Sequence, residues 1–113
     1  MKFNFEKKIR ILDDLLYYCH GLGATDYSVH VRVDPGATHF EVICPVAVIG
    51  KDEIARITET LNRPRQRELE QNYWGLTGEY ELEGDLAMAG IMIDEAEVTY
   101  ENGTLCIVAR RFR

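Results

Sequence analysis

The apolar positions near the start of the chain recur at the spacing of an α-helix. From residue 5 to about residue 22, apolar side chains return every three or four positions, and charged residues such as Lys8 and Asp13 lie off that stripe. Gly21 and Gly23 then predict where the helix ends. We expect the stripe that faces the core to consist of Phe5, Ile9, Leu12, Leu16 and Cys19.

A regular alternation of apolar and polar residues follows, and it predicts a β-hairpin. The segment YSVHVRV (27–33) leads into the turn sequence DPGA (34–37), whose proline and glycine supply turn dihedrals, and THFEVIC (38–44) returns. The hairpin should have one apolar and one polar face. The predicted pairs are Val33 with Thr38, Val31 with Phe40 and Val29 with Val42 on the apolar face, and His30 with Glu41 and Arg32 with His39 on the other.

The second half of the chain predicts helices followed by another hairpin. Helical spacing covers residues 51–61, a short helix should follow Pro64 and end near Gly75, and the glycine-punctuated segment 75–84 predicts a loop. Residues 85–93 (DLAMAGIMI) indicate a buried helix. The last hairpin turns at Asn102-Gly103, a strong hairpin signal, and should place Val98 opposite Ile107 and Tyr100 opposite Leu105.

Two antiparallel hairpins with helices between them favour an α+β fold. We expect a two-layer sandwich, in which a mostly antiparallel sheet of two hairpins is covered on one face by helices. The 113 residues suit a single domain, 1–113, with a hydrophobic core of its own.

Charge and cysteine usage narrow the classes of partner. Thirteen Lys and Arg stand against 19 Asp and Glu, a net charge of −6, which argues against binding nucleic acid or an anionic membrane. No stretch has the pattern of a signal peptide or a membrane span. Cys19, Cys44 and Cys106 are far apart and odd in number, as expected for free thiols in a reducing compartment, so we expect a cytoplasmic protein.

Three short segments carry a family resemblance. They are DDLLYYCHG (13–21) on the first helix, CPVAV (44–48) at the end of the hairpin, and EGDLAMAG (83–90) before the last hairpin. In order and spacing, the predicted elements resemble the histidine-kinase-like ATPase fold, called GHKL or Bergerat, over about residues 11–111. The resemblance implies that Asp13 stands at the position of the family's acid and that Gly84 keeps one glycine of its later turn.

The same resemblance implies that the nucleotide residues have been lost. Tyr17 stands where the family has the Asn that binds magnesium, and Cys44 stands where it has the Asp that reads adenine. Val46 and Val48 replace the two glycines that follow. A phenol does not ligate Mg²⁺ as an amide oxygen does, a thiol replaces a carboxylate poorly, and valine does not give the open backbone of glycine.

Other residues suggest either contact surfaces or side chains without a chemical role. Arg65, Arg67, Tyr73 and Trp74 combine arginines with aromatic residues, as interface hot spots do; the alternative is a solvated helix face with Trp74 in the core. His30, His39 and Glu41 could meet across the hairpin as a metal set, which depends on the register and the face, and we expect exposed strand residues instead. Cys44 has no basic neighbour in the sequence to activate it, so we expect it to be a buried thiol.

Three functions remain open at this stage. We expect a non-catalytic binding or regulatory module with no cofactor, which acts through a protein partner or a homo-oligomer, with Arg65, Arg67, Tyr73 and Trp74 as interface candidates. The enzyme alternative is a divergent nucleotide-binding ATPase or kinase-type domain, in which Asp13, Cys44 and Gly84 would contact the nucleotide. The third is a small-ligand sensor with an apolar pocket beside Val46 and Val48.

Overall fold

The computed structural model describes residues 2–63 and 86–112, with side chains from Phe5 onward. The predicted short helix after Pro64 and the predicted loop 75–84 lie outside these residues. The described elements, in chain order, are α1 (Lys2–Gly21), β1 (Ser28–Val33), β2 (Ala37–Pro45), α2 (Lys51–Leu61), α4 (Ala87–Met92), β3 (Glu95–Glu101) and β4 (Thr104–Phe112).

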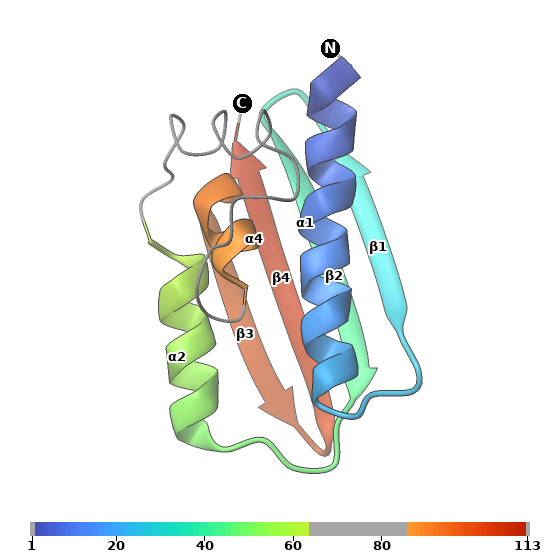
Figure 1. Cartoon of the computed structure of the whole chain (residues 1–113), viewed down its shortest axis with the longest axis vertical. Helices are drawn as coiled ribbons and strands as arrows, with labels where there is room; N and C mark the ends of the chain where they lie inside the picture. The colour runs from blue at the N-terminus through green and yellow to red at the C-terminus, as the bar shows by residue number, and fades with distance from the viewer. Residues whose placement is uncertain (1, 64–85, 113) are drawn as a thin grey trace, which may run out of the picture.

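The strands form one antiparallel sheet in the order β1-β2-β4-β3. The two hairpins are joined in the middle, where β2 pairs with β4 from Ala37–Phe112 to Pro45–Thr104. Figure 1 shows α1, α2 and α4 on the same face of this sheet. The α+β class, the two hairpins and the helical layer on one face are therefore confirmed.

The registers and turns predicted for both hairpins are also confirmed. Val29 lies opposite Val42 and Val31 opposite Phe40 in the first, and Val98 lies opposite Ile107 in the second. Asn102 and Gly103 both have positive φ values, 51° and 76°, as the two-residue turn of a tight hairpin requires. In the first turn, the Asp34 carboxylate accepts hydrogen bonds from the backbone N–H groups of two residues of the turn, 36 and 37.

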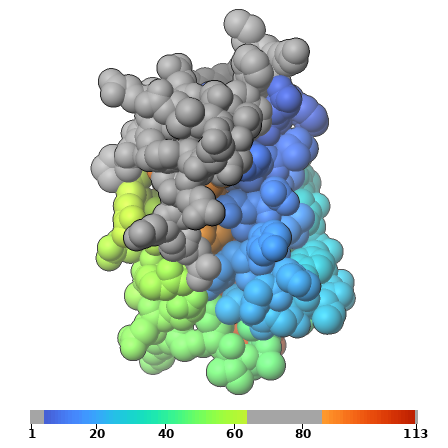
Figure 2. Space-filling view, in the orientation of Figure 1, coloured from blue at the N-terminus to red at the C-terminus, as the bar shows by residue number. Residues whose placement is uncertain are grey.

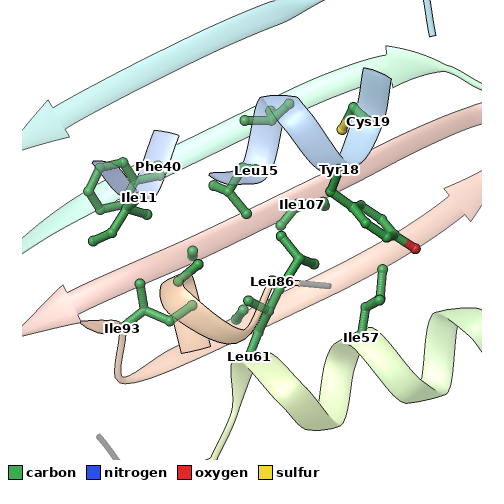
Figure 3. Packing of buried hydrophobic residues seen from close by; sticks show 14 of the residues in the cluster. Ile11, Leu15, Tyr18, Cys19, Phe40, Ile57, Leu61, Leu86, Ile93 and Ile107 are labelled. Atoms are coloured by element: carbon green, nitrogen blue, oxygen red, sulfur yellow. The ribbon is translucent and has the colours of Figure 1, made fainter. Parts of the chain in front are cut away.

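The core lies between the sheet and the helices (Figure 3). Its largest fully buried side chains come from every layer. They are Phe40, Ile11, Leu15, Ile57, Leu61, Met92, Ile93, Leu105, Ile107 and Val42, with the thiols of Cys19 and Cys44. Because a buried aliphatic or aromatic side chain stabilises the fold by about 1.5–3 kcal/mol, this cluster supplies the main driving force for folding.

The stripe predicted to bury α1 is wrong for its first turns. Phe5 and Ile9 are 64% and 50% exposed, Leu12 and Leu16 are partly buried, and the fully buried positions are Ile11, Leu15 and Cys19. The helix packs against α4 as well as against β2, so the face between those two neighbours is the buried one. Helical spacing identified the apolar positions but not the direction from which the second neighbour covers the helix.

The face predicted to bury the β1 valines is also only partly covered. Val29, Val31 and Val33 are 43%, 39% and 50% exposed, although their partners Phe40 and Val42 on β2 are fully buried. In Figure 1, α1 lies in front of β2 and leaves β1 at the outer edge of the sheet. A hairpin register therefore does not guarantee that both strands are covered.

Three polar side chains fasten the β3–β4 hairpin to the helices and to the segment that follows β2. The Asn62 amide donates to the Thr58 and Ala96 carbonyls and accepts from the Ala96 N–H, which joins the end of α2 to β3. The Tyr100 hydroxyl contacts the Val46 carbonyl at 2.7 Å. The buried Arg111 guanidinium donates to the last carbonyl of α4 at 2.7 Å. Hydrogen bonds of this kind satisfy backbone groups that are costly to bury without a partner.

Candidate functional site

A cleft of about 360 Å³ lies between α1 and α2 on the helical face of the molecule. Figure 2 shows this face, with α1 in blue and α2 in green. The cleft is lined by residues from α1 and the turn after it, from the first turn of α2, and from the residue before α4. They are Asp14, Tyr17, Tyr18, Gly21, Leu22, Glu53 and Leu86.

Glu53 is the carboxylate on the α2 side of the cleft. Arg56 donates to both of its oxygens, at 3.0 and 2.7 Å, and the Tyr18 hydroxyl donates to Oε2 at 2.5 Å. The hydrogen bonds from Arg56 first, and that from Tyr18 second, hold the pKa of Glu53 below its usual value. Glu53 is therefore an anion at neutral pH, and its bond to Tyr18 joins α1 to α2 across the base of the cleft.

Asp14 is the carboxylate on the α1 side. Its Oδ2 accepts a hydrogen bond from the Ala89 N–H at 2.9 Å, within the first turn of α4. The chain enters α4 through Leu86, which has a left-handed φ of 65°, an uncommon conformation for a residue with a side chain. A negative charge is thus already present beside the N–H groups at the start of α4.

Tyr17 supplies an aromatic rim. Its side chain is 74% exposed, and its ring meets that of His20 edge to face, with centroids 6.4 Å apart. Tyr17 is one of the residues that line the cleft. The face of its aromatic ring attracts cations, as the two carboxylates do.

These groups define the chemistry that the cleft favours. Two carboxylates and two phenols, one of which is the exposed Tyr17 ring, are surroundings in which proteins bind an ammonium or guanidinium group. They disfavour phosphates, because Asp14 and Glu53, the charged groups that the described residues contribute to the lining, are anions. In the part of the chain that the structure describes, no three His, Cys, Asp or Glu side chains come close enough to hold a metal ion.

Of the described residues that the resemblance singles out, Tyr17 lines this cleft, and Asp13 and Cys44 do not. Asp13 is exposed and does not line it, whereas the next residue, Asp14, does. Cys44 is fully buried in the core. The remaining predicted residues lie outside the described ranges: Gly84, Arg65, Arg67, Tyr73 and Trp74.

The thiols of Cys44 and Cys19 interact with one another in the core. Burial, followed by a hydrogen bond to Cys44, raises the pKa of Cys19 to about 12, so the thiolate of Cys19 is strongly disfavoured. All three cysteines, Cys19, Cys44 and Cys106, are free. The Cys19–Cys44 pair therefore acts as core filling rather than as a nucleophile.

Two further expectations concern the strand β2 and its end. The cleft is not lined by Val46 or Val48, since Val46 is buried and Val48 is highly exposed. His39 contacts Asp34 at 2.9 Å, as part of the first hairpin turn. The apolar pocket wall that was expected at Val46 and Val48 thus does not form this cleft.

The sequence reasoning named Tyr17 and Gly21 for other reasons but did not identify the cleft, and it missed Asp14, Tyr18, Leu22, Glu53 and Leu86. On α1, Asp14, Tyr17, Tyr18 and Gly21 recur at spacings of three and four, which places them on one flank of a helix. That spacing was the available signal. The contribution of Glu53 and Leu86 comes from the tertiary fold and has no local signal.

No protein-family model matches this chain, and neither a curated protein nor a solved structure matches it. The resemblance to the histidine-kinase-like ATPase fold therefore stays a prediction. Among the helices of residues 2–63 and 86–112, none combines the length and the apolar composition needed to cross a bilayer.

Proposed function

We propose that this protein is a non-catalytic binding module whose cleft takes a positively charged side chain of a protein partner. The observation that carries the proposal is the pairing of Asp14 and Glu53 across a cleft with a tyrosine rim. Glu53 stays ionised because its pKa is lowered. An arginine or lysine side chain suits such a site by charge, by hydrogen bonding and by contact with the Tyr17 ring.

The overall charge supports the same kind of partner. The chain carries a net charge of −6, so its field attracts a basic partner and accelerates the encounter. A partner of this kind also agrees with the absence of nucleic-acid or anionic-membrane partners that the composition predicts. We also propose a cytoplasmic location, which agrees with three free thiols.

One observation and one general argument favour contact over nucleotide chemistry. The Asp14 carboxylate accepts from the start of α4, where a phosphate would meet a like charge. Fold analogy by itself carries no activity. We therefore expect no heat in a calorimetric titration with ATP or ADP at about millimolar concentration, with or without Mg²⁺, while the protein is folded. Micromolar binding would refute the non-catalytic assignment and revive the nucleotide-binding alternative.

The cleft itself is tested with a matched pair of small probes. N-acetyl-arginine amide carries the guanidinium, and N-acetyl-citrulline amide has nearly the same shape without the charge. We expect the arginine probe, and not the citrulline probe, to shift the backbone amide signals of Tyr17, Gly21 and Leu22 in a heteronuclear NMR titration. Glu53→Gln should weaken that response, and the exposed Glu59→Gln, on the same helix, serves as the control. Equal shifts with both probes would contradict the proposal.

A further inference from the structure

The outer edge of β1 combines an exposed strand with an exposed apolar surface. All six residues of β1 are exposed, and within the described chain the strand pairs only with β2. We call Phe5, Ile9, Val29, Val31 and Val33 the β1 strip; each of these side chains is between 39% and 64% exposed. Exposed apolar side chains beside an open sheet edge are a common feature of interaction sites.

The α1 members of the strip face the β1 side of the molecule. At about 100° per residue, Phe5 lies roughly 180° and Ile9 roughly 140° around the helix from Asp14. Asp14 is bonded to α4, and Figure 1 shows α4 and β1 on opposite sides of α1. The helix therefore extends the apolar surface of the valines instead of covering it.

The sequence through β1 is complementary to itself in one antiparallel register. With Val29 opposite Val29 of a second copy, and with the pairing continued two residues before the start of β1 at Ser28, Asp26 lies opposite Arg32 twice, by symmetry. Within one copy Arg32 contacts Asp34 at 3.1 Å, so in the dimer it lies near two carboxylates. Tyr27 then lies opposite Val31, and Ser28 lies opposite His30. Opposite charges and aromatic–aliphatic pairs are the cross-strand combinations that stabilise antiparallel strands.

Neighbouring registers that keep the apolar faces together lack this complementarity. Centring the pair on His30 sets Asp26 opposite Asp34, and centring it on Val31 sets His30 opposite Arg32. Centring it on Arg32 sets that arginine against itself. Each of these arrangements loses the Asp26–Arg32 attraction, and two of them oppose like charges.

The other edge of the sheet is protected against such pairing. β3 carries Glu95, Glu97 and Glu101 on the face away from the helices, and Ala96 on its other face is buried beneath them. Glutamates along an edge strand are a common safeguard against strand addition. β1 has no acidic residue between Ser28 and Val33.

We propose that two copies of this chain associate through their β1 strands, antiparallel and with Val29 on the two-fold axis. The two sheets then form one continuous eight-stranded sheet, and the valines of each β1 strip gain apolar neighbours from the other copy. The two copies use the same surface, as a two-fold symmetric dimer requires. This association does not depend on the cleft between α1 and α2.

The experiment measures mass by light scattering during size-exclusion chromatography. At about 100 μM the wild type should elute as a dimer, since that concentration populates a dimer of micromolar affinity. Asp26→Arg and Arg32→Asp each place like charges opposite one another, and each should raise the dimer dissociation constant by about tenfold or more. Glu101→Arg, a charge reversal on the opposite edge of the sheet, is the control and should dimerise as the wild type does.

Mixing the two single variants tests the register. In a mixed pair, the arginine introduced by Asp26→Arg faces the aspartate introduced by Arg32→Asp, and the two native charges face one another. We expect an equimolar mixture, measured over a series of loading concentrations, to recover the dimer dissociation constant of the wild type, which neither variant reaches alone; circular dichroism shows that both are folded. A monomeric wild type, single variants that dimerise as tightly as the wild type, or a mixture that dimerises no more tightly than the single variants would each overturn the proposal.

Discussion

The two edge strands of the sheet have similar alternating sequences but different surroundings. On β3, Ala96 is buried, Val98 and Tyr100 pack against the core, and Asn62 and Tyr100 fasten the strand to the elements above it. On β1, the corresponding valines remain about half exposed. Alternation assigns a side chain to a face of the sheet. Whether that face is covered depends on where the helices lie.

The β3 and β1 sides also differ in what they contribute: one mainly to the stability of the fold, the other mainly to association with other molecules. The β3 side is rich in polar bonds that join helix, loop and strand, so substitutions there should act mainly on the free energy of unfolding. The β1 side contributes less burial and offers an open edge, so substitutions there should act mainly on contacts with other molecules. The following predictions test this contrast.

The largest effect should come from opening a cavity under the helices. Ile107 is fully buried on β4, so Ile107→Ala should lower the free energy of unfolding by about 2–5 kcal/mol. Val31→Ala on β1 should cost less than about 1 kcal/mol, because the side chain is already partly in water. Urea denaturation followed by circular dichroism, at low protein concentration, measures both. Similar losses would refute the contrast between the two sides.

A smaller effect should come from the close approach of α2 and α4. A Cβ added to Gly90 would lie 2.7 Å from the backbone oxygen of Thr60, so Gly90→Ala should cost about 1–3 kcal/mol by forcing the helices apart. Gly21→Ala is the matched control, because nothing lies within 4 Å of its added Cβ. Thermal unfolding of both variants measures the two losses of stability. A Gly90 variant as stable as wild type would mean that the helices separate freely.

Removing the Asn62 side chain should have a comparable or smaller effect. Asn62→Ala leaves the Ala96 N–H and C=O without their partner and should cost about 1–3 kcal/mol. Hydrogen exchange should quicken at Ala96 more than at residues of β1. Glu59→Ala, an exposed substitution one turn earlier in α2, provides the baseline. Unchanged exchange at Ala96 would show that Asn62 does not fasten β3.

The smallest effect should be a dependence on acid at the first hairpin turn. The hydrogen bond with His39, and then those from the backbone of Ala37 and Gly36, lower the pKa of Asp34 from 3.8 to about 2. Because the folded value lies below the unfolded one, this stabilisation is fully present above pH 3.8 and is lost as the pH falls through about 2. Carbon-detected NMR titration of the carboxyl group measures this pKa directly, and a pKa near 3.8 would contradict the predicted lowering.

A substitution that removes the charge of Asp34 tests whether this carboxylate causes the loss of stability in acid. Asp34→Asn removes the titrating group, so its stability should change less than that of the wild type between pH 5 and pH 2. The exposed Asp13→Asn is the control, and should retain the acid dependence of the wild type. Parallel loss of stability in Asp34→Asn and wild type would assign the acid dependence to other groups.

Local signals were sufficient for most of the architecture. The helix Lys51–Leu61 matches its predicted bounds, and the turn at Asn102-Gly103 fixed the register of its hairpin because few residues tolerate positive φ values. The buried helix Ala87–Met92 was also predicted from its composition. These features depend on neighbours in the sequence, which a single chain displays.

The features that were missed depend on distant neighbours. Phe5 and Ile9 belong to an apolar stripe, but α4 packs on the opposite flank of α1, so they stay exposed. The cleft requires Glu53 and Leu86 to meet Asp14, and only the packing of α1, α2 and α4 brings them together. The charges of Asp26 and Arg32 were visible in the sequence, but their pairing between two copies is suggested only by the position of β1 at the edge of the sheet.

The central pairing of β2 with β4 has a consequence for synthesis. The strand Ala37–Pro45 leaves the ribosome long before Thr104–Phe112, its partner in the middle of the sheet. Until the later strand arrives, one side of β2 presents unpaired backbone groups beside Phe40 and Val42. During translation the nascent chain thus exposes an unpaired strand edge that is prone to aggregation. A chaperone that shields this edge should raise the yield of folded protein.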